Sequence, residues 1–471
     1  MIRLSQIFDP APGLERWKRF QSHYSRRIKV LNFKGSLEHN DLSALLIAIQ
    51  RTRPSLAILP NLRELNWIGS DHGRFEDMIM FICENLKDLS CSGEEDDLDP
   101  SFLPLLCETI QVLAPGLTNL ILDIYPSSVY VSPLADHLKS LVNLTHLTIP
   151  AFPNISPILS TLDSFLSSLR SLSFNAFATN MAVTDTGGSL CNFPALYNLE
   201  FSTKTYQTVG QFLRASQLGA LTSLTLDTIS LERPASIRTL LLDISQRYPF
   251  LEELELKFKE CELKEHPDIQ NSPLDTSPII AFNDFAPILN CKRISLFMLD
   301  HPHALNISDP DLERVALAWK GLKSLNLSNT PLNKNHHDIT KPTLWSILFL
   351  ANQCPDLEEL TILVDTRPAS MLPPNQIPSP GSSHTARKKV AALMSLDVGH
   401  SLIESDDVNR VASLLSQVCS PRCELTWDDD TDELPWHKVE DLLPYFSRMQ
   451  STIRVQSERI GFLEHRLGMK G

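Results

Sequence analysis

Glycine is scarce in this sequence, with 16 residues in a chain of 471, or about 3% against the usual ~7%. The sequence has neither a GxxxxGK phosphate-binding loop nor a GxGxxG dinucleotide-binding fingerprint, and it has no GxSxG nucleophile elbow. These absences exclude the common glycine-dependent ways of binding a nucleotide or presenting a catalytic serine. We therefore expect a protein that is not an enzyme and that needs no cofactor.

Long apolar segments are also missing. No run of about 18 apolar residues would span a bilayer. The first residues, MIRLSQIFDPAPGLERW, contain no apolar core of about 7 to 15 residues such as a signal peptide requires. We expect a cytoplasmic or nuclear protein that does not contact a membrane.

Cysteine and histidine form no recognisable disulfide or metal pattern. The nine cysteines are an odd number scattered among apolar positions, which is typical of free buried thiols. Cys419 and Cys423 fall near a predicted helix end and are interpreted as structural thiols. Clustered histidines fall in predicted loops: His301, His303, His336 and His337. Because a metal needs convergent ligands with an ordered surrounding shell, we expect no metal site.

Positive charge is in deficit. The chain has 42 lysines and arginines against 56 acidic residues, a net charge of −14 at pH 7. Such a chain is poorly suited to bind phosphates, so we expect no nucleic-acid partner. A partner with a basic surface would be attracted instead. The two most acidic stretches, GEEDDLD after Ser92 and WDDDTDE from Trp427, are interpreted as solvated loops.

What the sequence does contain is a repeated apolar pattern. The stretch SLVNLTHLTIPAF has apolar residues at Leu144, Leu147 and Ile149, an LxxLxL spacing that fits neither an amphipathic helix nor a simple alternating strand. Related hexapeptides recur at intervals of about 24 to 40 residues, near the period of about 20 to 29 of leucine-rich repeats. They begin at Ile28, Leu62, Leu86, Leu117, Leu144, Leu169, Leu196, Leu221, Leu251, Cys291, Leu322, Leu357, Leu393 and, in a weaker copy, Arg422.

The repeat predicts an α/β fold, a leucine-rich-repeat solenoid over residues 28–427 with a curved parallel inner sheet and outer helices. The second and third apolar anchors of each copy alternate on a short strand and point inward. Segments between the copies have the i, i+3, i+4 and i+7 spacing of helices. These segments follow Glu38, Gly73 and Ala235 and begin at Ser308 and Lys341. Ser308 is predicted to cap its helix, with Asp311 three residues later.

Strand positions between the anchors are predicted to face the concave side of the sheet. They are polar and mostly able to form hydrogen bonds, which favours a protein-binding surface over a catalytic centre. The candidate protein-binding residues are Glu64, Asn66, Asp88, Asn119, His146, Asn198, Glu200, Glu253, Glu255, Arg293, Asn326 and Glu359.

Part of the sequence resembles a known family. The segment LERWKRFQSHYSRRIKVLNF, with Trp17, Phe20 and Tyr24, is similar to the lead-in to the repeats of fungal F-box proteins of the leucine-rich-repeat type. ISDPDLERVALAWKGLKSLNL and LFLANQCPDLEELTI look like the helix-then-strand units of that family, and the resemblance extends from about Trp17 to Ile362. It implies a protein-binding adaptor that recognises substrates for a cullin-based ubiquitin ligase. We assign residues 1–27 to a lead-in helix.

The F-box that would dock the ligase adaptor is not visible in this chain. ELPWHKVEDLLPYF, from Glu433, resembles the Leu-Pro opening of an F-box, but it lies near the C-terminus, whereas an F-box is an N-terminal module. The resemblance therefore implies binding of the ligase adaptor only if an F-box is supplied elsewhere. Two alternatives stay open: a leucine-rich-repeat GTPase activator that presents an arginine such as Arg63 or Arg293, and a scaffold independent of any ligase.

Two segments depart from the repeat. Residues 366–389 are rich in proline and serine and are predicted to be a disordered insertion. Residues 434–471 are predicted to form a capping amphipathic helix whose continuous part begins at Pro444. Its apolar residues follow a heptad: Val439, Leu442, Phe446, Met449, Ile453, Ile460, Leu463 and Leu467. We expect weak self-association through the part after Ile453.

Overall fold

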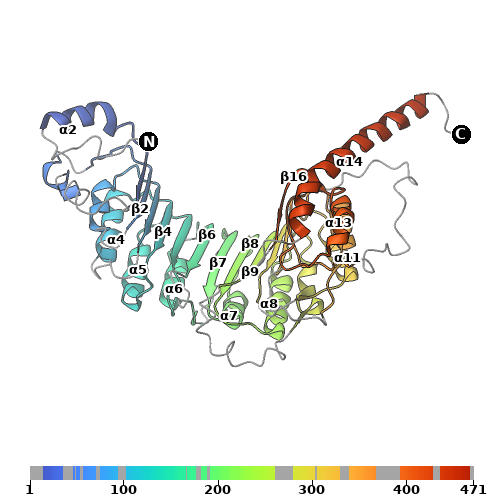
Figure 1. Ribbon diagram of the computed structural model, residues 1–471. Helices are drawn as coiled ribbons and strands as arrows, with labels where there is room; N and C mark the ends of the chain where they lie inside the picture. Colours follow the sequence, from blue (N-terminus) through green and yellow to red (C-terminus); the bar gives the residue numbers. More distant parts are fainter. Residues whose placement is uncertain are drawn as a thin grey trace. The chain divides into compact units, whose positions relative to one another are not determined.

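The computed structural model (Figure 1) describes residues 14–34, 46–47, 49–53, 57–69, 75–93, 102–165, 167–176, 182–187, 191–259, 279–302, 305–328, 339–367, 393–427 and 435–466. The predicted insertion at 366–389 lies outside these residues except for Thr366 and Arg367, and so do His303, His336 and His337. Within the described ranges, no helix is both long and apolar enough to cross a membrane.

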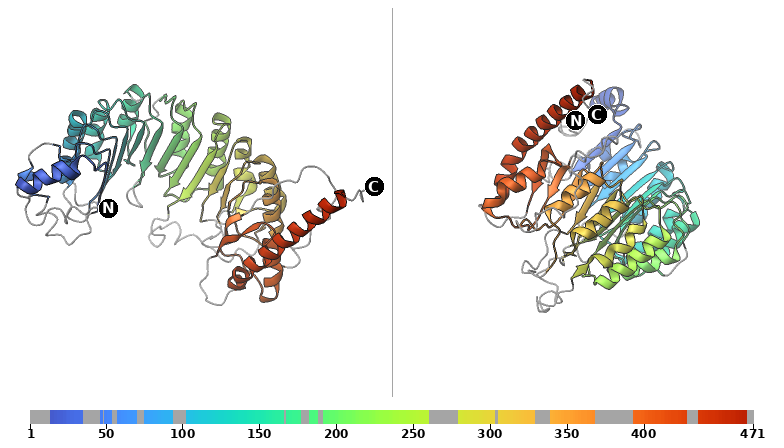
Figure 2. Two further views of the ribbon diagram at one scale, coloured as in Figure 1. Left: turned by 90° about the horizontal axis from the view of Figure 1, so that it is seen from above. Right: turned by 90° about the vertical axis from the view of Figure 1, so that its right-hand side faces the viewer.

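The chain divides into two compact units. Unit 1 comprises Met1–Ser230 with Lys259–Leu263, and unit 2 comprises Leu231–Phe258 with Lys264–Gly471. In each unit the main sheet is parallel, its strands follow one another in chain order, and helices lie along one face of it (Figures 1 and 2). The predicted α/β fold with a parallel sheet and outer helices is confirmed at this level.

Among its described residues, unit 1 holds eight strands of its sheet. The chain enters through α2 (Leu14–Phe20) and the π-helical turn η1 (Gln21–Ser25). The strands are β1 (Val30–Lys34), β2 (Glu64–Ile68), β3 (Asp88–Ser92), β4 (Asn119–Asp123), β5 (His146–Pro150), β6 (Ser171–Asn175), β7 (Asn198–Thr203) and β8 (Ser223–Thr228). The connecting helices are η2 (Phe75–Phe81), α4 (Phe102–Leu113), η4 (Ser128–Tyr130), α5 (Val131–Leu138), α6 (Ser156–Phe165) and α7 (Tyr206–Ala215).

The described part of unit 2 holds six strands of a parallel sheet and a separate short strand pair. The six strands are β9 (Glu253–Phe258), β11 (Leu296–Leu299), β13 (Ser324–Leu327), β14 (Glu359–Thr361), β15 (Leu393–Asp397) and β16 (Cys419–Thr426). The short pair is β10 (Ile280–Ala281) with β12 (Leu305–Asn306). The helices are α8 (Pro234–Arg247), α10 (Phe282–Phe285), η7 (Ala286–Asn290), α11 (Asp309–Ala318), α12 (Leu344–Gln353), η9 (Ser405–Asp407), α13 (Val408–Leu415) and α14 (Pro435–Arg466).

From β2 to β15, each repeat of the main sheet buries three apolar anchors. In the repeat that contains β5, Leu144 lies in the turn before the strand, while Leu147 and Ile149 point from the strand into the core, all at most 1% exposed. The register pairs Leu147 with Leu120 on one side and Leu172 on the other, so equivalent anchors stack from strand to strand. Because burying a leucine side chain contributes about 1.5–3 kcal/mol, this stack is the main source of stability.

Asparagine side chains link successive repeats of unit 1. Asn61, Asn85 and Asn143 each immediately precede the first anchor of a repeat. Each Nδ2 donates to a backbone carbonyl of the repeat before it, at 2.8 to 2.9 Å. These hydrogen bonds satisfy carbonyls at the turns where the chain enters each strand.

The predicted helix starting at Ser308 is confirmed. Ser308 precedes α11 as its N-cap, and the Asp311 carboxylate accepts hydrogen bonds from Ser308 N at 3.0 Å and Ser308 Oγ at 2.6 Å. The segment after Gly73 is instead the 3₁₀-helix η2. Its repeat has the shortest interval between first anchors, 24 residues from Leu62 to Leu86. Because a 3₁₀-helix rises about 2.0 Å per residue against 1.5 Å for an α-helix, fewer residues complete the return.

The first half of α14 packs against α13 and β16. Trp436, Val439 and Leu443 are at most 3% exposed, and Trp436 Nε1 donates a hydrogen bond to Ser401 O at 2.7 Å. The prediction that the continuous helix begins at Pro444 is wrong, because the described helix runs unbroken from residue 435 and Pro444 lies inside it. Burial of the residues around it stabilises a helical turn that proline alone would weaken.

Candidate functional site

The face of each sheet opposite the helices carries mostly polar side chains, and we call it the polar face. It is formed by strand positions that alternate with the buried anchors. In unit 1 the parallel register aligns these positions in two main rows. The first row is Val30, Glu64, Asp88, Asn119, His146, Ser171, Asn198 and Ser223. The second is Asn32, Asn66, Ser90, Ile121, Thr148, Ser173, Glu200 and Thr225.

Hydrogen bonds within a strand and between neighbouring strands hold several of these side chains in place. Asn66 Nδ2 donates to Asn32 Oδ1 at 2.7 Å and to Glu64 Oε1 at 2.8 Å. Ser173 Oγ donates to Glu200 Oε2, also at 2.8 Å. Since these side chains are ordered before any partner arrives, binding to this face costs less conformational entropy than binding to mobile side chains.

One carboxylate at the end of unit 1 belongs to the fold and not to the polar face. Asp227, on β8, is only 4% exposed. Its Oδ2 forms an ion pair with Lys259 Nζ at 2.8 Å and accepts a longer hydrogen bond from Ser202 Oγ at 3.4 Å. The ion pair offsets the cost of burying this charge, so Asp227 is assigned a structural role.

The polar face of unit 2 is acidic. Its strands place five carboxylates at outward positions: Glu253, Glu255, Glu359, Asp397 and Glu424. Lys257 Nζ forms an ion pair with Glu255 Oε2. With more carboxylates than ammonium groups in these rows, the face favours a positively charged partner.

The register predicted for β11 is wrong, and with it the placement of Arg293. The sequence CKRISLFML contains two overlapping LxxLxL patterns, one from Cys291 and one from Ile294. The structure uses the second, because Phe297 and Leu299 are the buried strand anchors. Arg293 lies in the turn before β11 with its guanidinium carbon 4.8 Å from the centre of the Phe250 ring.

The corrected register places two apolar residues on the polar face of unit 2. Leu296 is aligned with Glu253 on one side and Ser324 on the other. Met298 is aligned with Glu255 and Asn326. Both side chains are partly exposed. Sequence reasoning missed this pair because it used the first of the two overlapping patterns.

The structure places the remaining eleven predicted residues at outward positions of its strands. In unit 1 these are Glu64, Asn66, Asp88, Asn119, His146, Asn198 and Glu200; in unit 2 they are Glu253, Glu255, Asn326 and Glu359. Arg63, named as an alternative arginine, is exposed in the turn before β2.

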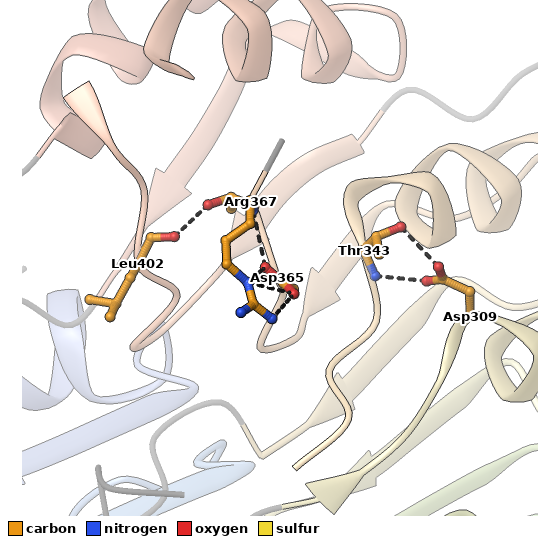
Figure 3. Close-up of polar contacts among 6 residues, drawn as sticks. Asp309, Thr343, Asp365, Arg367 and Leu402 are labelled. Carbon is orange, nitrogen blue, oxygen red and sulfur yellow. Dashed lines mark hydrogen bonds and ion pairs between the residues drawn. The ribbon is translucent and has the colours of Figure 1, made fainter. Parts of the chain in front are cut away.

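A second set of polar contacts in unit 2 lies among the segments that follow and precede its strands (Figure 3). The Asp309 carboxylate accepts hydrogen bonds from Thr343 N at 2.7 Å and Thr343 Oγ1 at 2.9 Å. Asp365 accepts from Arg367 Nε at 3.0 Å and Arg367 Nη2 at 2.6 Å. Burial raises the pKa of Asp365, but its hydrogen bonds and ion pair with Arg367 outweigh this, so its pKa lies below the ordinary value. The Asp309 contacts link two return segments, whereas the pair of Asp365 and Arg367 is local, and neither set presents a reactive group.

Metal ligation is not supported by the part of the chain that the structure describes, where no three potential metal-ligating side chains converge. His301 is buried, with Nε2 3.0 Å from Glu232 O, and the structure gives it a role in the core. No known protein family matches this sequence, and a search of curated proteins finds no significant relative.

Proposed function

We propose that this chain is a non-enzymatic adaptor of the leucine-rich-repeat type, and that its polar face binds another protein. The apolar pair Leu296 and Met298 carries this proposal. Partly exposed apolar side chains within a polar surface are typical of the centre of a protein interface, where a few residues supply most of the binding energy. The flexible methionine side chain also adapts to differently shaped partners.

The surroundings of this pair indicate the chemistry of the partner. Glu253 and Glu255 lie on β9, next to the apolar pair, and Glu359 lies on β14 beyond β13. A complementary surface has an apolar side chain that contacts Met298 and lysine or arginine side chains around it. Electrostatic attraction would speed association, and salt would weaken it.

Site-specific photo-crosslinking tests the proposal. A photoreactive amino acid at Ser324, beside Leu296 in the row, should capture the partner in cells, and the same residue at Leu242 should not. Leu242 is 44% exposed on α8, which makes it a matched position away from the polar face.

The captured protein is then purified and its affinity measured. Met298→Glu should weaken binding about tenfold or more, while Leu242→Glu should leave it within about twofold, since surface substitutions away from an interface are nearly neutral. Equal affinities for the two variants would refute the assignment of the binding face.

The more specific form of the proposal is that the bound protein is a substrate for ubiquitination. The lead-in segment and repeats that resemble fungal F-box proteins support it, with the F-box supplied elsewhere. Reconstitution with the cullin-based ligase, its adaptor and an F-box subunit should yield ubiquitin conjugates of the captured protein that are lost with Met298→Glu. Binding without conjugation would leave a scaffold function instead.

A further inference from the structure

The last strand of unit 2 contains an irregularity with a cysteine at each end. Leu393 of β15 is aligned with Cys419 of β16, and Ser395 is aligned with Glu424. From one aligned pair to the next, β15 advances by two residues while β16 advances by five. The extra residues of β16 form a bulge that ends at Cys423. The sequence-based expectation of a helix end here is wrong, because both cysteines belong to the strand.

The bulge brings the two thiols together. Its two ends are held by strand partners two residues apart, a span of about 7 Å. Cys423 precedes the far end of the bulge by one residue, so the backbone brings it close to Cys419, and the two thiols interact. Cys423 Sγ also lies 3.7 Å from Glu424 O. Cys419 is 6% exposed, whereas Cys423 is partly exposed. The pair therefore has one accessible sulfur and one sheltered sulfur.

The hydrogen-bonding interaction between the two thiols also shifts their pKa values in opposite directions. It lowers the pKa of Cys423, although burial and the nearby Glu424 carboxylate act in the opposite direction. The same hydrogen bond, together with burial, raises the pKa of Cys419. Other buried thiols behave differently. Burial, with a smaller effect of the Asp163 carboxylate, raises the pKa of Cys191 to about 11. Burial also raises the pKa of Cys291 to about 11, although Lys292 acts in the opposite direction. Thiolate character and access together determine which cysteine reacts.

We propose that Cys419 and Cys423 form an oxidation site that closes to an intramolecular disulfide when the protein meets a peroxide. The Cys423 thiolate attacks one peroxide oxygen, the O–O bond breaks, and hydroxide leaves, giving a sulfenic acid on Cys423. The Cys419 sulfur then attacks the Cys423 sulfur, the S–O bond breaks, and the oxygen leaves as water with the Cys419 proton. Overall, two thiols and hydrogen peroxide give one disulfide and two waters.

Peptide mapping of the full chain tests this directly. The reduced protein is treated with hydrogen peroxide, remaining thiols are blocked with iodoacetamide, and trypsin digestion is done without reductant. Trypsin cuts after Arg422, between the two cysteines, so a disulfide leaves the peptides 411–422 and 423–438 joined. The expected result is that this pair is the predominant linked product and that a reductant separates it.

Single-cysteine variants distinguish the two roles. With Cys419→Ala or Cys419→Ser, Cys423 should accumulate sulfenic acid, detected with dimedone, because its partner is gone. With Cys423→Ser, Cys419 should stay unmodified in the folded chain. Circular dichroism checks that each variant is folded. The peptide map of the wild-type protein tests the disulfide even if a variant fails to fold.

Internal controls come from the same digest. Cys191 and Cys291 should stay reduced under peroxide and be alkylated only after denaturation. The proposal is overturned if Cys423 is oxidised without forming the linked pair, or if Cys419 or Cys423 joins another cysteine instead, including Cys261, which lies outside the described residues.

Discussion

At the scale of single residues, Asp309 stabilises a helix other than its own. It lies in the first turn of α11, yet its carboxylate accepts hydrogen bonds from the backbone and side chain of Thr343, the N-cap of α12. Ser346 Oγ, in the first turn of α12, donates to the same carboxylate at 2.5 Å. The negative charge also lies near the positive end of the α12 dipole.

Asp309→Ala should therefore lower the free energy of unfolding by about 2 kcal/mol, because it removes a charged acceptor and leaves Thr343 N without its partner. Urea denaturation followed by circular dichroism measures the change. Asp136→Ala is the control, since that carboxylate, on α5, pairs with the exposed Lys139 just after the helix and such pairs contribute little. If the two substitutions had equal effects, Asp309 would not act as a cap.

Some polar-face positions could be predicted from the sequence and others could not. Glu64, Asn66 and their equivalents were predictable because two-residue alternation is a strict property of strands. Leu296 and Met298 were not, because an unbroken apolar run permits two registers and only packing against neighbouring strands selects one. The contact between Cys419 and Cys423 depends on a bulge, which has no reliable local signature.

At the scale of elements, α14 covers the last strand of unit 2 with a short apolar stripe. Trp436, 1% exposed, fills the space beside β16 and α13 and hydrogen-bonds to the loop after β15. The buried stripe continues through Val439 and Leu443 to Ser447. Pro444 lies beside this stripe, so the packing outweighs the hydrogen bond that proline cannot donate.

Trp436→Ala should destabilise unit 2 by about 3–5 kcal/mol, since it leaves a large cavity and an unpaired Ser401 carbonyl. Hydrogen exchange should show faster exchange in β16 and α13. Tyr445→Ala is the matched control, because Tyr445 is an aromatic residue of the same helix but is 70% exposed. Unchanged protection of β16 in the Trp436 variant would mean that α14 does not support the strand.

Element types were predictable where local and tertiary preferences agree. The anchors around Leu147 and the cap at Ser308 are examples, since the pattern, the capping chemistry and the packing select the same conformation. η2 and Pro444 are the exceptions. In the first, the short repeat requires more rise per residue than an α-helix gives; in the second, burial overrides a local proline rule.

At the scale of the whole molecule, charge and apolar residues indicate which surface could join two copies of the chain. The net charge of −14 disfavours contact between two copies of the chain through their acidic faces. Charge repulsion does not oppose pairing through the heptad pattern of the C-terminal helix. In the sequence, Ile460, Leu463 and Leu467 form an apolar series after the part of α14 that packs on β16. Self-association is therefore expected through this helix and not through the polar faces.

The pairing should be weak, because the series spans few heptads and Gly461 costs about 1 kcal/mol relative to alanine in a helix. Sedimentation of the full chain should show a mass that rises with concentration. A chain ending at Thr452, and a full chain with Ile460→Glu and Leu463→Glu, should both remain monomeric. Met298→Glu serves as the control and should self-associate like the wild type. A full chain that stays monomeric at its highest soluble concentration would rule out pairing through α14, while self-association that survives both changes would place the contact elsewhere on the molecule.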